Sequence, residues 1–206
     1  MIMVISMVVF FVSFASLARS LFVPSYRCYS RNTIALAAST VSSSDKDEWF
    51  HKGLQFSCHM CGHCCSGSTG SVRFTEDEAV KMASHVKVSK EQFYSDYTRR
   101  RGNKKNKYYE LKELRTSSGD YDCIFLDRVT MPGKSICSLY DARPAQCRTW
   151  PFWEENLVSE NVWKAVSKGV EGCAGIGIGP VIPYTDIIKQ RDDTIALESE
   201  WNGGVK

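Results

Sequence analysis

The stretch "SCHMCGHCCSGSTG", residues 57–70, places four cysteines within eight positions, with His59 and His63 between them. The four are Cys58, Cys61, Cys64 and Cys65. Thiols this close together serve as disulfides, as zinc ligands, as iron–sulfur ligands or as a catalytic pair. The rest of the chain has to decide among these four uses.

Outside this loop the chain carries five more cysteines of its nine, and one of them, Cys28, falls in a segment that we expect to be removed. The eight that remain are Cys58, Cys61, Cys64, Cys65, Cys123, Cys137, Cys147 and Cys173. An even set of eight fits a disulfide framework, but such scaffolds are usually shorter than about 80 residues. The adjacent Cys64 and Cys65 would also need separate partners or a strained bond between them. We therefore favour metal binding over disulfides.

The spacing C-x-x-C-x-x-C-C suits convergence on a metal, because a C-x-x-C loop turns its backbone around one ion. Gly62 stands where such a loop often requires a positive φ. Cys64 continues the curl, whereas Cys65 is expected to point another way unless the backbone bends sharply. With eight thiolates available, neither His59 nor His63 is needed as a ligand.

All-sulfur ligation selects zinc or an iron–sulfur cluster over magnesium or calcium. The triple spacing of Cys58, Cys61 and Cys64 also occurs in ferredoxin-type loops, which favours iron–sulfur slightly. Eight thiolates suffice for two four-cysteine sites, or for one cluster with spare thiols. The sequence separates neither zinc from iron nor these two arrangements.

The first 44 residues have the composition of a targeting segment. Residues 2–18 are almost wholly apolar, and the following stretch is rich in serine and arginine, with the first acidic residue at Asp45. An apolar core followed by a basic, acid-free stretch predicts a two-part plastid address. A mitochondrial presequence, secretion and an uncleaved membrane anchor are the alternatives.

The remaining chain, residues 45–206, is predicted to be one domain of near-neutral charge. The 26 basic residues exceed the 23 acidic ones by three, and Arg19, Arg27 and Arg31 of the targeting segment account for that excess. This balance indicates neither nucleic acid nor a membrane surface as a partner of the mature domain. About 160 residues can bury a modest single core.

Two capping patterns predict helices in the middle of the chain. Thr75 and Glu78 form a capping box that opens a helix over residues 75–86, and Ser89 with Gln92 opens another over 89–97. A third helix is expected over residues 184–201.

Strands are expected at residues 71–75 and in a hairpin across 108–127, whereas the basic run 99–107 is expected to be a solvated loop. Residues 171–183 contain too much Gly and Pro for a helix. The prediction is a small, irregular α+β domain organised around a cysteine-ligated metal site, with a short β-hairpin and a few helices.

Taken together, "CHMCGHCCSGSTGSVRFTEDE", "CIFLD", "CSLYDARPAQCRTWPFW" and "CAGIGIG" resemble, in this order, the blocks of the CxxCxxCC (YkgJ-type cysteine cluster) family. The resemblance covers roughly residues 54–180, and Ala174 departs from a proline common in the family. It implies a zinc- or iron-chelating domain whose metal ligands are all eight cysteines. It implies no particular reaction.

Arg143 and Arg148 flank Cys147, and we predict that they lie beside the metal ligands and offset thiolate charge. A salt bridge to Asp141 or Asp127 is the equal alternative. Trp150 and its aromatic neighbours are expected in the core. No catalytic residue and no protein partner can be assigned. Beside plain metal binding, two functions compete: a cluster-dependent oxidoreductase or methyltransferase-type enzyme, and a structural zinc module that docks a partner protein.

Overall fold

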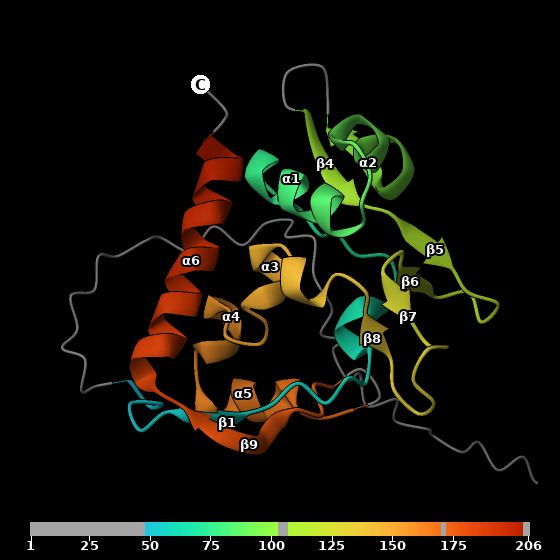
Figure 1. Ribbon diagram of the computed structural model, residues 1–206. Helices are drawn as coiled ribbons and strands as arrows, with labels where there is room; N and C mark the ends of the chain where they lie inside the picture. Colours follow the sequence, from blue (N-terminus) through green and yellow to red (C-terminus); the bar gives the residue numbers. More distant parts are fainter. Residues whose placement is uncertain (1–47, 103–106, 170–171, 204–206) are drawn as a thin grey trace, which may run out of the picture.

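The computed structural model describes residues 48–102, 107–169 and 172–203. The predicted targeting segment, residues 1–44, and Cys28 lie outside these ranges. Within them, no helix is long and apolar enough to cross a bilayer. The described residues form a small single domain of mixed α+β structure, as predicted (Figure 1).

Both capped helices are confirmed. α1 (Glu76–His85) begins after Thr75, whose side chain accepts the Glu78 N–H while the Glu78 carboxylate accepts the Thr75 N–H. α2 (Lys90–Tyr97) begins after Ser89, whose hydroxyl accepts the backbone N–H of Gln92. Each cap satisfies a helix N–H that has no partner within the helix.

The predicted hairpin across residues 108–127 is confirmed in its inner part, whereas residues 107–111 and 126–127 pair with other strands. It consists of β5 (Glu113–Arg115) and β6 (Tyr121–Cys123), which pair antiparallel. The other edge of β6 pairs with β2 (Ser66–Gly67), directly after the cysteine loop. This pairing fixes the end of the loop against the strand that carries Cys123.

The prediction of a loop at residues 99–107 is wrong for the described part of that run. β3 (Thr98–Gly102) pairs over its full length with β4 (Lys107–Leu111). The arginines of β3 are not all free in solvent. Arg99 and Arg101 both form ion pairs with Glu110, which is 3 % exposed. A buried carboxylate needs such partners. Residues 103–106 lie outside the described ranges.

The strand expected at residues 71–75 is reduced to one isolated bridge, from Arg73 to Glu110. Side chains take the backbone N–H groups there: Gln146 accepts that of Arg73, and Glu78 accepts that of Thr75. An N–H that bonds to a side chain cannot extend a ladder of strand hydrogen bonds.

The Cys147 region is compact and irregular, as expected. Its short elements are β7 (Leu126–Asp127), β8 (Ile136–Cys137), η2 (Tyr140–Ala142), α3 (Ala145–Arg148), α4 (Glu154–Leu157) and α5 (Glu160–Val166). β7 and β8 pair antiparallel and bring Cys137 opposite Leu126.

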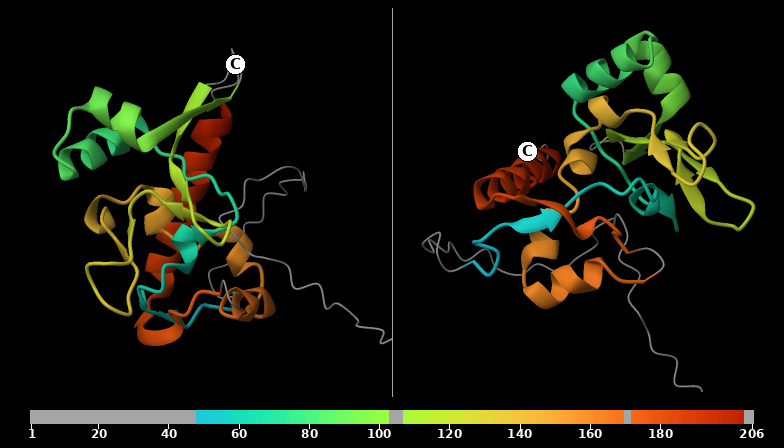
Figure 2. Two further views of the ribbon diagram at one scale, coloured as in Figure 1. Left: turned by 90° about the vertical axis from the view of Figure 1, so that its right-hand side faces the viewer. Right: turned by 60° about the horizontal axis from the view of Figure 1, so that its bottom comes forward.

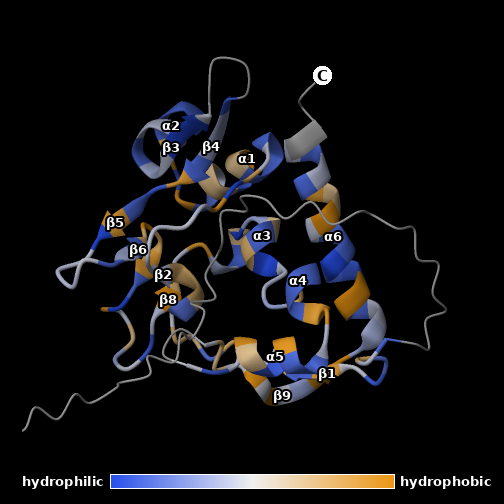
Figure 3. Ribbon diagram, turned by 180° about the vertical axis from the view of Figure 1, so that it is seen from behind, coloured by the Kyte–Doolittle hydropathy of each residue, from blue (hydrophilic) through white to orange (hydrophobic). Residues whose placement is uncertain are grey.

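The C-terminal part contains a strand and the longest helix. β9 (Ile176–Ile182) pairs antiparallel with β1 (Leu54–Phe56), so the start and the end of the domain lie side by side. α6 (Tyr184–Gly203) confirms the third predicted helix. Hydrophobic and hydrophilic stretches alternate along α6 (Figure 3), and its Ile187 and Thr194 are buried.

Two hydrophobic clusters make up the core. The first, called core A here, consists of Phe74, Ala79, Met82, Ala83, Phe93, Leu111, Phe125 and Leu139. The second, core B, consists of Phe50, Phe152, Leu157, Trp163 and Ile187. The α1–α2 pair of core A lies at the opposite end of the molecule from α5 of core B (Figure 2).

Candidate metal centre

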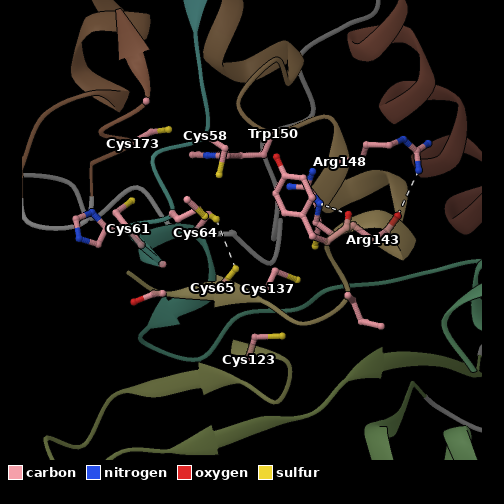
Figure 4. Close-up of a pocket in the computed structure, with 18 of the residues that line it drawn as sticks. Cys58, Cys61, Cys64, Cys65, Cys123, Cys137, Arg143, Arg148, Trp150 and Cys173 are labelled. Carbon is pink, nitrogen blue, oxygen red and sulfur yellow. Dashed lines mark hydrogen bonds between the residues drawn. The ribbon is translucent and has the colours of Figure 1, made fainter. Parts of the chain in front are cut away.

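A cavity of about 120 Å³ lies between the two cores, and all eight predicted ligands line it. They are Cys58, Cys61, Cys64, Cys65, Cys123, Cys137, Cys147 and Cys173, and seven of them are labelled in Figure 4. Core A contributes Leu111, Phe125 and Leu139 to the wall, while Phe56 packs against core B. The tertiary structure thus gathers thiols from positions up to 115 residues apart in the chain.

The cysteine loop turns at Gly62, which has φ 79° and precedes the 3₁₀ turn η1 (His63–Cys65). The Cys65 N–H closes this turn on the Gly62 carbonyl at 2.9 Å. A Cβ at position 62 would lie 2.6 Å from the Cβ of Ser135. Both the positive φ and the close approach require glycine, which confirms the prediction made for this position.

The loop is anchored to other segments along its length. The N–H of Ser135 donates to the carbonyl of Met60 at 2.8 Å, and Lys134 Nζ donates to that of His59 at 3.2 Å. His63 Nδ1 lies 2.8 Å from the Gly172 carbonyl oxygen, just before Cys173. This contact gives His63 a positioning role in the loop.

Cys64 and Cys65 do not diverge as the sequence suggested. Their Sγ atoms lie 3.5 Å apart, because the turn after Gly62 bends the backbone sharply. This distance is far longer than an S–S bond of about 2.05 Å. In the part of the chain that the structure describes, all eight cysteines are thiols and none forms a disulfide.

Three of the distant cysteines each accept a hydrogen bond from the backbone N–H two residues further on. The pairs are Phe125 to Cys123, Leu139 to Cys137, and Gly175 to Cys173. Burial raises the pKa of all three thiols, that of Cys123 to about 12, and the N–H groups oppose this rise. An N–H that points at sulfur stabilises a thiolate and is ready to support a metal ligand.

Cys64 lies at the electrostatic centre of the group. Its charge raises the pKa values of Cys65, Cys123, Cys137 and Cys173. Its own pKa is lowered to about 7, mainly by the hydrogen bond with Cys65, with a smaller effect from the charge of Arg143. The same hydrogen bond raises the pKa of Cys65 well above the ordinary value, because both thiols cannot ionise easily side by side.

Comparison with known families gives this geometry its context. The sequence profile of the CxxCxxCC family, whose description is "Putative zinc- or iron-chelating domain", matches residues 57–167, more than half of the chain. The chain belongs to the CxxCxxCC family. No solved structure matches it.

The donor set of this CxxCxxCC domain fits zinc or iron by its chemistry. All eight cysteines line one cavity, and backbone N–H groups already point at the sulfurs of three of them. In the described residues, however, no three His, Cys, Asp or Glu side chains stand close enough together to hold an ion. Metal binding therefore requires thiol side chains to rotate toward one another.

The two arginines predicted beside the ligands both line the cavity. The Arg143 guanidinium stacks over the Tyr140 ring at 3.8 Å, and its Nε donates to the Tyr140 carbonyl. Its charge lowers the pKa of Cys64 and opposes the rise at Cys137. Arg148 Nη1 donates to the Arg143 carbonyl at 3.3 Å, so Arg148 supports the residue that acts on the thiols (Figure 4).

Sequence reasoning missed the part that Trp150 plays. Phe152 and Trp153 are buried as predicted, but Trp150 is only partly buried and lines the cavity. Its side chain donates a hydrogen bond to the Cys173 thiol, which opposes the effect of burial on the pKa of Cys173. An indole N–H close to cysteines in the sequence could have signalled this, since such a donor must find a partner when buried.

Proposed function

We propose that this CxxCxxCC domain binds zinc or iron through its eight cysteines and that the bound metal holds its segments together. One observation carries the proposal: thiols from the loop, β6, β8, α3 and the turn before β9 all line one cavity. Partly buried thiols without a cation are held protonated by their surroundings, as the raised pKa values of Cys123, Cys137 and Cys173 show. A metal cation makes the thiolate form favourable there.

The cavity contacts both cores, so metal bound there would link them. This supports a structural role in the first place, because binding free energy becomes folding free energy when only the folded chain offers the site. Thiolate ligands select zinc or iron over hard cations. The ferredoxin-like spacing favours an iron–sulfur cluster, but the 3.5 Å between Cys64 and Cys65 fits two sulfurs on one metal and not on separate corners of a 4Fe–4S cluster. We give the distance more weight, because spacing alone does not fix where sulfurs point.

Elemental analysis of anaerobically purified protein tests this proposal directly. We expect stoichiometric zinc or iron without acid-labile sulfide, and a colourless zinc form or a thiolate-coloured iron form. Iron with an equal amount of sulfide would replace isolated metal ions by a cluster. Protein that binds neither metal and keeps all eight thiols blocked from alkylation would instead support disulfides and overturn the proposal.

A cluster-dependent redox enzyme is the second candidate function, and the exposure of Cys58 and Cys64 favours it. Metal bound at exposed thiols can be reached by a small electron donor. Reversible reduction of the iron-loaded protein, followed by its absorption spectrum, tests this. If the iron cannot be reduced and reoxidised without being lost, the redox function is ruled out and only the structural role remains.

A further inference from the structure

The distance between the sulfurs of Cys64 and Cys65 indicates whether these two residues can bind the same metal ion. In a tetrahedral site with metal–sulfur bonds of about 2.3 Å, two sulfurs on one ion lie about 3.8 Å apart. The observed 3.5 Å is close to that edge. Sulfurs bound to different irons of one cluster point outward from separate corners and lie farther apart. Cys64 and Cys65 are therefore placed to hold the same ion.

A second cavity groups two further cysteines with this pair. It measures about 60 Å³ and adjoins the main cavity. Four of the eight cysteines line both cavities and so stand between them: Cys64, Cys65, Cys123 and Cys147. Cys123 and Cys147 are also the two thiols, besides Cys64, whose charges reach Cys65. All four line the boundary of the two cavities, and their side chains must rotate to reach one ion.

The remaining four cysteines, Cys58, Cys61, Cys137 and Cys173, line the main cavity and not the second one. Two come from the C-x-x-C loop and two from distant segments. The charge of Cys58 reaches Cys137, and that of Cys61 reaches Cys173. Cys64 also lies near Cys137 and Cys173, and the charge of Cys137 reaches Cys123, so the two groups of four adjoin each other (Figure 4).

We propose that the eight cysteines form two adjoining four-thiolate sites, each for one zinc or iron ion. Site 1 consists of Cys64, Cys65, Cys123 and Cys147, and site 2 consists of Cys58, Cys61, Cys137 and Cys173. The inference rests on the proposed function, since it divides the ligands of the same centre. Each site joins two sulfurs of the loop to two sulfurs of the scaffold, so each ion fixes the loop to the rest of the domain.

Metal counting in variants of the full chain tests this division. The wild-type chain, reconstituted with zinc, should hold two ions. Cys65→Ser and Cys61→Ser should each lose one ion and keep the other, while the double variant should lose both. Cys28→Ser, which removes the ninth cysteine, is the matched control and should keep two ions. Zinc per chain is measured by elemental analysis and native mass spectrometry.

The same experiment separates failure of the division from failure of metal binding. If wild type binds no metal, both proposals fall. If each single variant loses all of the metal, or the metal comes with inorganic sulfide, one polynuclear centre is present and only the division falls. If a variant does not fold, NMR of the wild-type chain loaded with isotopically labelled cadmium tests the division instead. Two tetrathiolate resonances support the division, and a single one overturns it.

Discussion

At the scale of single residues, the metal centre depends on backbone conformation as much as on thiols. Gly62 allows the turn that brings the Sγ atoms of Cys64 and Cys65 to 3.5 Å. Backbone N–H groups then point at Cys123, Cys137 and Cys173. Arg143 adds a positive charge at the cavity wall. Each of these features can be changed without removing a thiol.

Gly62→Ala should destabilise the folded protein more than Gly133→Ala. Both glycines have a positive φ, which costs a non-glycine residue roughly 1–2 kcal/mol. Only Gly62 also faces a close neighbour, because a Cβ there meets Ser135, whereas nothing lies within 4 Å of one at Gly133. Urea unfolding of both metal-loaded variants measures the difference. Equal losses would show that the loop does not pack tightly against Ser135.

In metal-free, reduced protein, Cys64 should be the first of the eight thiols to react with iodoacetamide near neutral pH. Its pKa is lowered to about 7, and the thiolate is the reactive form, so its rate should rise as the pH increases through that value. Cys123, whose pKa is raised to about 12, should react far more slowly. Pulsed alkylation with peptide mass spectrometry gives the rate for each thiol.

Arg143→Gln should move the Cys64 profile to higher pH, because it removes a charge that lowers this pKa. Arg100→Gln, which removes a charge from an exposed position of β3 outside the cavity, is the control and should leave the Cys64 profile unchanged. Uniform alkylation of all eight thiols would mean that the metal-free protein does not retain this pocket.

At the scale of elements, Glu78 connects α1 to the helix that carries Cys147. One carboxylate oxygen accepts the Thr75 N–H in the capping box, and the other accepts the Ala145 N–H of α3 at 2.6 Å. Gln146 of the same helix bonds both Ser71 and Arg73. α3 is only four residues long, so these side chains, rather than its own hydrogen bonds, hold it in place.

Glu78→Ala should therefore cost more stability than Thr75→Ala and should also weaken metal binding. Loss of the Thr75 cap is expected to cost about 1 kcal/mol. Loss of Glu78 removes two charge-assisted hydrogen bonds, and we expect about 2–3 kcal/mol. Unfolding and zinc competition with a chromophoric chelator measure both effects. Ser89→Ala, which removes only the α2 cap, should leave zinc affinity unchanged. If it lowered zinc affinity as much as Glu78→Ala does, the effect of Glu78 would reflect a general loss of stability.

At the scale of the whole molecule, the two cores meet at the cavity. Cys123 and Cys137 pack against core A, while Phe56 in the cavity wall packs against core B. β1 and β9 close the domain on the side of core B. Each core alone is small, so we expect the contacts across the cavity to contribute to cooperative unfolding.

Removal of metal by a chelator under reducing conditions should unfold or loosen both cores together. Structural thiolate sites contribute on the order of 10 kcal/mol, comparable to the whole stability of a domain. Acid should have the same effect, because protons compete with metal for thiolates and metal affinity falls as the pH decreases. Near-ultraviolet circular dichroism and hydrogen exchange at Phe93 and Phe152 report on the two cores. If hydrogen-exchange protection at Phe93 and Phe152 did not change on metal removal, the metal would have no structural role.

We propose that residues 1–44 direct the chain to a plastid, from their apolar core and acid-free, arginine-containing continuation. A fluorescent protein fused after residue 44 should enter the plastid of an alga with complex plastids. The same fusion lacking residues 1–18 should stop short of it, since the apolar part would provide the first step. Mitochondrial or secreted fluorescence would identify one of the alternative addresses.

The sequence by itself determined where the helices begin and that Gly62 turns the loop, and it supplied the eight thiols that the fold brings to one cavity. These properties are local: thiol chemistry, caps such as Thr75 and a positive φ depend on a few neighbouring residues. Only the tertiary structure decided that Cys64 and Cys65 face each other, that Arg99 and Arg101 belong to a strand around buried Glu110, and that Trp150 donates to Cys173. These depend on contacts between segments far apart in the chain, because burial and the competition for backbone N–H groups exist only once those segments have packed.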